Sequence, residues 1–234
     1  MVFDRPHVLN AGDAAWVADL GRAVRRLARD KAVRVVVVTG VGRGFSTGLD
    51  LDALAHGKLR LPHLIAWEDA MTAMERSPAF FIAAINGHCV GGGLQMALVC
   101  DYRLASEDAL IGLPAVREGL IPSMAPYRLP RLIGLARASE VILFGDNVPA
   151  REAERLGLVH RVVAAADFSR STDEMVDRAL AIPATSLRVS KQLLARAFDL
   201  PFGAFRRRME AGLRECLASP EHRAAMAAIR SRRG

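Results

Sequence analysis

The sequence predicts an α/β fold followed by a largely helical C-terminal region. Three apolar runs, residues 33–39, 79–85 and 102–105, have the composition of strands buried on both faces, as in a parallel sheet. A glycine triplet, residues 91–93, follows the second run and opens a helical pattern, and from residue 137 onward the pattern is mostly helical. Strands, glycine-rich turns and helices in alternation are typical of a layered α/β scaffold.

Residues that favour element boundaries support these assignments. Apolar residues recur at helical spacing over residues 14–30, and Asp13 fits the N-cap of that helix. A helix over residues 61–77 should end before Pro78, and the turn pair Asn86-Gly87 closes the strand that follows. Further helices are predicted over residues 94–99, 150–156, 172–181, 187–198, 205–217 and 221–229.

Composition narrows the class of protein. The 234 residues are 51% hydrophobic and 24% charged, which allows one well-packed domain with a helical appendage. The N-terminal residues include an acid and a proline in place of an apolar signal core, and no apolar run has membrane-spanning length. We therefore expect a cytoplasmic protein without a membrane partner. Cys89, Cys100 and Cys216 form no C-x-x-C pair, so we expect free thiols and no metal.

Positive charge is concentrated at the C-terminal end. Residues 201–234 contain eight Arg and three Glu, which is +5 of the total net charge of +7. A solvated helix face is the favoured interpretation, and an anionic small molecule is the second. Nucleic acid comes last and is not expected as a partner, because no aromatic residues alternate with these arginines to stack on bases.

One short motif suggests a nucleophilic serine. Residues 44–48 read G-x-S-x-G, the pattern of a hydrolase nucleophile elbow. An elbow places its serine where a strand passes directly into a helix, but the strand here ends near Thr39, well before Ser46. A partner such as His160 is available in any chain of this length. Serine hydrolysis is therefore only a third hypothesis.

Backbone chemistry explains the glycines better. Gly48 allows a tight turn that leaves the amide of Leu49 free, and glycines at a helix start leave further amides free. Gly48 and Gly91 lie about 43 residues apart, and each loop follows an apolar strand. Two such amides that converge would form an oxyanion hole for the oxygen of a thioester carbonyl.

Four sequence blocks resemble the crotonase (enoyl-CoA hydratase/isomerase) superfamily. They are DRPHVLNA at 4–11, GRGFSTGLDL at 42–51, INGHCVGGGLQMALVCDYRLASEDA at 85–109 and GLIPSMAPYRLPRLIG at 119–134, with a fifth segment at 150–163. The resemblance implies a spiral of ββα units over residues 1–165 and a C-terminal helical region over residues 166–234 that forms homotrimers or hexamers. It also implies an acyl-CoA or acyl-carrier thioester substrate. Coenzyme A would then be part of the substrate, with no permanently bound cofactor.

The resemblance also assigns residues by position. It makes the amides of Leu49 and Gly92 the oxyanion hole. The substrate would contact His7, Val8, Thr47, Gly48, Asp50, Leu51, Asp52, Gly91 and Ala115.

The sequence departs from the family where protons are handled. Hydratases of the family carry two glutamates, at the positions that hold Gln95 and Ala115 here. An amide cannot accept a proton near neutral pH, and losing a general base forfeits roughly 10²–10⁴ in rate. We therefore expect inefficient hydration. The first strands of the family are also missing, so we expect either an upstream start or a lost sheet edge.

Few residues can replace the two glutamates. Glu118 follows Ala115 closely. The segment IPSMAPYRL at 121–129 departs from the glycine-rich stretch usual in the family, and its Ser123, Met124, Pro126 and Tyr127 would give the acyl pocket a different floor. Glu118 and Tyr127 are therefore candidate acids or bases, although a surface carboxylate beside Arg117 is the favoured interpretation of Glu118. Glu68, Asp69 and Glu75 are expected to be solvated charges on a helix face.

These observations favour an enzyme that stabilises an enolate during isomerisation, decarboxylation or thioester cleavage. The alternative is a thioester-binding scaffold without catalysis.

Overall fold

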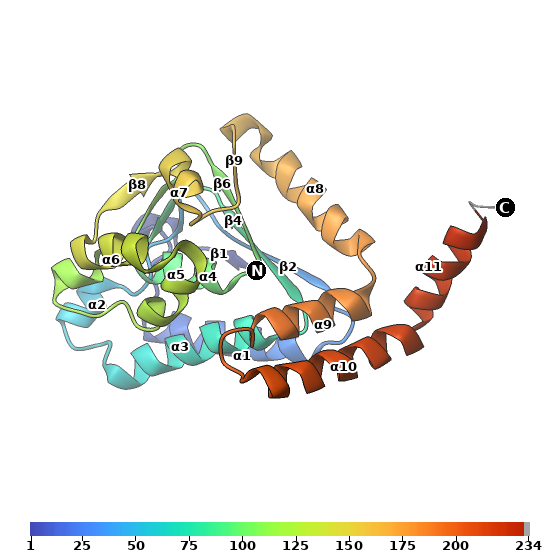
Figure 1. Ribbon diagram of the computed structural model, residues 1–234. Coiled ribbons are helices and arrows are strands. Elements are labelled where there is room, and N and C mark those ends of the chain that lie inside the picture. The colour runs from blue at the N-terminus through green and yellow to red at the C-terminus, as the bar shows by residue number, and fades with distance from the viewer. Residues whose placement is uncertain (232–234) are drawn as a thin grey trace.

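Two β-sheets form the body of the molecule in the computed structural model, which describes residues 1–231 (Figure 1). The larger sheet is entirely parallel, and its strands, in spatial order, are β1 (Val2–Phe3), β2 (Val35–Gly40), β4 (Phe80–Ile85), β6 (Tyr102–Ser106) and β9 (Arg161–Val163). The smaller sheet consists of β3 (Gly44–Ser46), β5 (His88–Val90), β7 (Leu110–Gly112) and β8 (Asn147–Pro149). Only β8 runs antiparallel to its neighbour.

The chain alternates between these sheets, and this alternation makes the spiral. Each of three strands of the larger sheet leads directly into a strand of the smaller one: β2 into β3, β4 into β5 and β6 into β7. Helices follow each strand pair: α2 (Leu51–Ala55) and α3 (Leu61–Arg76), then α4 (Gly92–Val99), then α5 (Ala125–Ile133) and α6 (Leu135–Phe144). The predicted spiral of ββα units is confirmed.

Helices outside these units flank the sheets. Helix α1 (Ala14–Arg29) packs against α3, and the Asp13 carboxylate accepts the amide of Trp16 at 2.9 Å, which confirms the predicted N-cap. Short 3-10 turns occur at η1 (Pro6–Val8), η2 (Pro114–Glu118) and η3 (Ala165–Asp167), and α7 (Ala150–Leu156) precedes β9.

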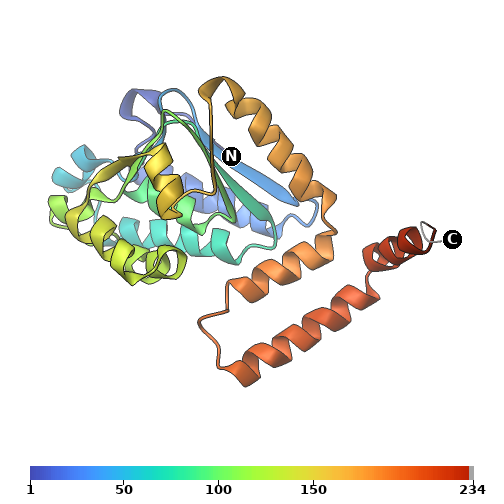
Figure 2. The same ribbon diagram turned by 45° about the horizontal axis from the view of Figure 1, so that its top comes forward.

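The C-terminal helices lie progressively farther from the sheets along the chain. Helix α8 (Phe168–Ala181) contacts β2, β4 and β6, and α9 (Ala184–Leu194) contacts β4. Helix α10 (Phe202–Ala218) packs on α9, and α11 (Pro220–Ser231) extends away from the body (Figures 1 and 2). The six arginines described on α10 and α11 are exposed, which fits the solvated helix face; Arg232 and Arg233 lie outside the described residues.

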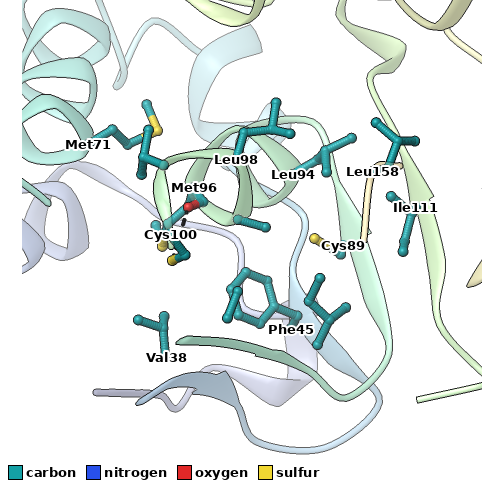
Figure 3. Close-up of a cluster of buried hydrophobic side chains, with 14 of the residues drawn as sticks. Val38, Phe45, Met71, Cys89, Leu94, Met96, Leu98, Cys100, Ile111 and Leu158 are labelled. Carbon is teal, nitrogen blue, oxygen red and sulfur yellow. Dashed lines mark hydrogen bonds between the residues drawn. The ribbon is translucent and has the colours of Figure 1, made fainter. Parts of the chain in front are cut away.

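The core is built from both sheets and from the helices packed on them, including α1, α3 and α4. Phe45, Leu94 and Ile111 are fully buried members of the cluster drawn in Figure 3. Cys89 and Cys100 are free and buried, and Cys216 is free, as predicted. Burial raises the pKa of the Cys100 thiol to about 12, so it stays neutral, and its Sγ donates to the carbonyl oxygen of Met96 at 3.4 Å.

No helix within residues 1–231 is long and apolar enough to cross a membrane.

Candidate active site

Two glycine loops meet at one edge of the smaller sheet. Strands β3 and β5 are parallel neighbours, so the loops that follow them emerge at the same edge. Gly48 has φ +89°, and a Cβ at this position would lie 2.4 Å from the backbone nitrogen of Gly92. A Cβ on Gly93 would lie 2.0 Å from the carbonyl oxygen of Ser46. Glycine is required at these positions because two backbones approach each other without room for side chains.

This contact brings two unpartnered amides together. Gly92 is the first residue of α4, so its N–H has no acceptor within the helix. The two chain neighbours of Leu49 form backbone hydrogen bonds with Gly12. The amide of Gly12 donates to the carbonyl oxygen of Gly48 at 2.7 Å, and the amide of Asp50 donates to the carbonyl oxygen of Gly12 at 3.0 Å. Neither Leu49 nor Gly92 donates its amide hydrogen to an acceptor within residues 1–231. Free backbone amides at the positive end of a helix are suited to donate hydrogen bonds to a negatively charged oxygen.

Leu49 and Gly92 both line a cavity of about 630 Å³. Ten of the residues expected at the site line it: Val8, Thr47, Leu49, Asp50, Leu51, Gly91, Gly92, Gln95, Ala115 and Glu118. The rest of the wall of this cavity, the acyl pocket, is largely apolar, which suits an acyl chain.

Known proteins share both the sequence pattern and this architecture. Residues 1–230 match the family model described as enoyl-CoA hydratase/isomerase. A probable enoyl-CoA hydratase of Rhizobium meliloti is 34% identical, over 100% of this chain and 91% of its own length. The (E)-benzylidenesuccinyl-CoA hydratase of Thauera aromatica is 35% identical, over 86% of this chain and 80% of its own. The chain belongs to the enoyl-CoA hydratase/isomerase family. An enoyl-CoA hydratase crystal structure from Bacillus anthracis superposes with a TM-score of 0.92, at 26% identity, covering 99% of this chain and 91% of that one.

In this member of the enoyl-CoA hydratase/isomerase family, Ser46 is a structural residue. Its side chain is fully buried, its Oγ donates to the carbonyl oxygen of Asn10 at 3.0 Å, and it accepts the amide of Gly48 at 3.1 Å. His160 accepts the amide of Arg103 through Nδ1 and stacks on Tyr102. The pKa of His160 is lowered to about 4, first because the ring is partly removed from water and second because Arg103 is near. The geometry therefore argues against the serine-hydrolase hypothesis.

Ser46→Ala tests this assignment. We expect turnover to fall by no more than about tenfold, which corresponds to about 1.4 kcal/mol in the barrier, because only the support of the Gly48 turn is lost. Removing a true serine nucleophile costs on the order of 10⁶ in kcat. The measurement is steady-state turnover together with mass spectrometry of the protein after incubation with thioester. A covalent acyl adduct on Ser46 would support the hydrolase.

Four expected site residues do not line the cavity. Gly48 instead approaches the backbone of Gly92. His7 and Asp52 are the chain neighbours of the lining residues Val8 and Leu51. Tyr127 lines a second cavity with Leu194 and Phe198. Helix α5 begins at Ala125 and carries Tyr127 away from the acyl pocket.

The expectation that Tyr127 donates a proton in the pocket is therefore not supported by its position. Its hydroxyl donates to the Asp199 carboxylate, and the Arg131 guanidinium lies 3.4 Å from the centre of its ring. The hydrogen bond to Asp199 raises the pKa of Tyr127, which makes it a weaker acid.

The apolar wall of the acyl pocket was not predicted. Ser123 lines the cavity, as the altered segment predicted, but the sequence did not indicate the other wall residues: Ala11, Leu54, Leu61, Leu64, Ile65, Trp67, Val90, Pro114, Leu120 and Ile121. A partial signal exists on α3, where Leu61, Leu64 and Ile65 share one helix face while Met71 and Met74 are buried in the core. When one apolar surface of a helix packs in the core, a second apolar surface on the same helix indicates contact with a ligand or a partner.

The polar groups on the wall have different environments. Gln95 is only 7% exposed, and its Oε1 has no hydrogen-bond partner within residues 1–231. Asp50 caps α2 by accepting the amide of Ala53 at 3.1 Å. Glu118 is exposed and forms no hydrogen bond or ion pair in the described part of the chain. Asp50 also forms an ion pair with Arg5 at 4.0 Å.

Proposed function

We propose that this family member binds acyl-CoA thioesters and stabilises an enolate oxygen with the amides of Leu49 and Gly92. The observation that carries the proposal is the pair of unpartnered amides at the contact of the two glycine loops, on the wall of a largely apolar cavity. A thioester oxygen between these amides gains hydrogen bonds as its negative charge develops. One such donor contributes about 3 kcal/mol to the transition state.

The proposed chemistry is isomerisation, decarboxylation or thioester cleavage. Family resemblance assigns the two water-handling positions to Gln95 and Ala115, and both line the cavity. Neither side chain can accept a proton near neutral pH. Efficient hydration by the usual pair of glutamates is therefore not expected, even though several relatives carry hydratase names.

Restoring both carboxylates should restore hydration. In the double variant Gln95→Glu with Ala115→Glu, we expect hydration of a short enoyl-CoA to rise by at least about tenfold, because a general base contributes roughly 10²–10⁴ in rate. The loss of absorbance of the conjugated thioester measures the reaction. Gln95→Asn with Ala115→Gln is the control, because it changes both side chains and adds no carboxylate. Rapid hydration by the unmodified protein would refute this view of Gln95 and Ala115.

A panel of acyl thioesters tests the proposed function itself. Enoyl-, malonyl-type and β-keto thioesters of coenzyme A, and the same acyl groups on an acyl carrier, would be incubated with the protein and analysed by mass spectrometry. Conversion of at least one is expected. Binding without conversion would favour the scaffold, for which the absence of both glutamates is the supporting observation.

We further propose that the protein is cytoplasmic and assembles into homotrimers or hexamers. Large apolar side chains are exposed along the C-terminal helices: Leu194, Phe198, Phe202, Leu213 and Leu217. Exposed apolar groups concentrated on one region are typical of an interface. Assembly would remove them from water.

A further inference from the structure

A chain of hydrogen bonds leads from the wall of the acyl pocket to a buried ion pair. Ser123 lines the pocket, and its Oγ donates to Oε2 of Glu68 at 2.9 Å. The other oxygen of Glu68 accepts from Nη2 of Arg128 at 2.7 Å and from the hydroxyl of Thr72 at 3.1 Å. The expectation that Glu68 is a solvated charge is wrong, because its side chain is only 15% exposed.

Arg128 fixes this carboxylate in place. Its side chain is 6% exposed and also contacts Glu75 through Nη2 at 3.1 Å. A guanidinium carries only hydrogen-bond donors, so Glu68 acts as an acceptor toward Arg128. Ser123 must then donate its hydroxyl hydrogen to Glu68, and its oxygen lone pairs remain available as acceptors.

The backbone of Ser123 supports a functional role. Its φ is +42°, in the left-handed region where glycine is favoured, and its amide donates to the carbonyl oxygen of Ile121 at 2.9 Å. A non-glycine residue in such a conformation is strained, and strain of this kind clusters at active sites. Glycine would relieve the strain but would remove the hydroxyl. The chain instead has the hydroxyl, on the wall of a pocket whose usual proton acceptors are replaced by Gln95 and Ala115.

We propose that Ser123 transfers the substrate proton and that Glu68 receives it through the serine hydroxyl, an inference that rests on the proposed function. The C–H bond at the α-carbon of the acyl thioester breaks, and its proton goes to Oγ of Ser123 while the hydroxyl proton passes to Oε2 of Glu68. The electron pair moves to the thioester oxygen between the amides of Leu49 and Gly92. Reverse transfer, to the α-carbon or to a conjugated carbon, restores both protonation states.

Deuterium exchange measures this step without assuming the overall reaction. The probe is a β,γ-unsaturated acyl-CoA in D2O, because enolate formation and reprotonation place deuterium in the substrate, where mass spectrometry detects it. Binding of the same thioester is measured separately by calorimetry. The wild-type protein is expected to bind the thioester and to exchange its α-hydrogen.

Two substitutions at Ser123 separate catalysis from stability. Ser123→Gly and Ser123→Ala both remove the hydroxyl, but only glycine relieves the strain at φ +42°. We expect Ser123→Gly to unfold at a higher denaturant concentration than Ser123→Ala. Both variants should bind the thioester, and both should lose exchange by roughly 10²–10⁴-fold, the usual contribution of a positioned proton-transfer group. A purely structural role would make the loss of exchange follow the loss of stability.

Two carboxylates on α3 provide a matched pair. Glu68→Gln and Glu75→Gln each remove one carboxylate partner of Arg128, but only Glu68 accepts the hydroxyl of Ser123. Glutamine at position 68 can still accept that hydrogen bond but cannot take up the proton. We expect Glu68→Gln to lose exchange by about 10²-fold or more and Glu75→Gln to stay within about threefold of wild type.

The outcomes distinguish this inference from the proposed function. If Ser123→Gly and Glu68→Gln exchange at the wild-type rate, the proton route is wrong while thioester activation at Leu49 and Gly92 stands. If the wild-type protein binds thioester and exchanges no hydrogen, the route is wrong and the scaffold alternative gains support. If no thioester binds, both the proposed function and the proton route fail.

Discussion

Replacing Gly48 with alanine should lower kcat by about 10²–10³-fold, which is the effect of losing one oxyanion-hole donor. The added Cβ would lie 2.4 Å from the nitrogen and 2.7 Å from the Cα of Gly92. Both contacts are with backbone atoms at the start of α4, so no side-chain rotation relieves them. The loops must separate, and the proposed oxyanion hole then loses the convergence of the amides of Leu49 and Gly92. Steady-state kinetics on a thioester that the wild-type protein converts would measure kcat and KM separately.

Gly57 provides the matched control. It also has a positive φ, +67°, but a Cβ there would meet nothing within 4 Å. Gly57→Ala therefore introduces the left-handed strain of about 1–2 kcal/mol without displacing a neighbour. We expect its kcat to stay close to that of the wild-type protein, with some loss of stability. Equal kcat values for Gly48→Ala and Gly57→Ala would contradict the role assigned to the loop contact.

Lys191→Met should lower the free energy of unfolding by about 3–5 kcal/mol, the usual loss when one partner of a buried ion pair is removed. Nζ of Lys191 donates to the carbonyl oxygen of Ala79 at 2.6 Å and to the Asp101 carboxylate at 2.7 Å, and the side chain is 7% exposed. These bonds join α9 to residues beside β4 and β6, so their loss also loosens the attachment of the C-terminal helices. Urea denaturation followed by circular dichroism would measure the change.

The exposed pair Arg206–Glu210 on α10 is the comparison for this effect. Arg206→Met should cost no more than about 1 kcal/mol, because its i,i+4 pair lies in water. Adding Asp101→Asn to Lys191→Met should recover part of the loss, since no buried charge then lacks a partner. A loss for Lys191→Met as small as that for Arg206→Met would show that the pair contributes little.

The deficit of Lys191→Met should also depend on pH. Burial raises the pKa of Asp101, and Lys191 opposes this shift, so removing the lysine raises that pKa further. The folded variant then binds a proton at a higher pH than the unfolded chain, whose Asp has a pKa of about 3.9. Stability linked to this group therefore increases as pH falls. We expect the difference from wild type to be largest near neutral pH and to shrink as the pH approaches about 4.

Features that depend on local chemistry were predictable. The apolar runs that became β2, β4 and β6, and the helix limits at Asp13 and Pro78, follow from residue preferences alone. Free amides at Leu49 and within residues 91–93 were expected from sequence, because glycine at a turn and at a helix start each leaves an amide free. The family resemblance then assigned the second amide to Gly92. The close approach of Gly48 to Gly92 in the structure agrees with that hypothesis.

Short elements gave no usable pattern. Strands β3, β5 and β7 have three residues each, too few to show alternation, and their strand conformation comes from pairing with one another. The apolar face of α3 at Leu61 could not be assigned to a pocket from sequence, because the opposite wall comes from residues near the smaller sheet. Tyr127 was expected in the acyl pocket, but it lies on α5 and lines the second cavity instead.

The sequence by itself determined the layered α/β class, the glycine turns and the chemistry of Gln95 and Ala115, because each of these depends on what single residues can or cannot do. The tertiary structure decided which groups meet across the chain. Glu68 and Ser123 are 55 residues apart and join only because α3 packs beside the segment that leads into α5. Burial then changes Glu68 from a solvated charge into a fixed carboxylate, since a buried ion must be paired. Spacing along a chain does not reveal such pairing.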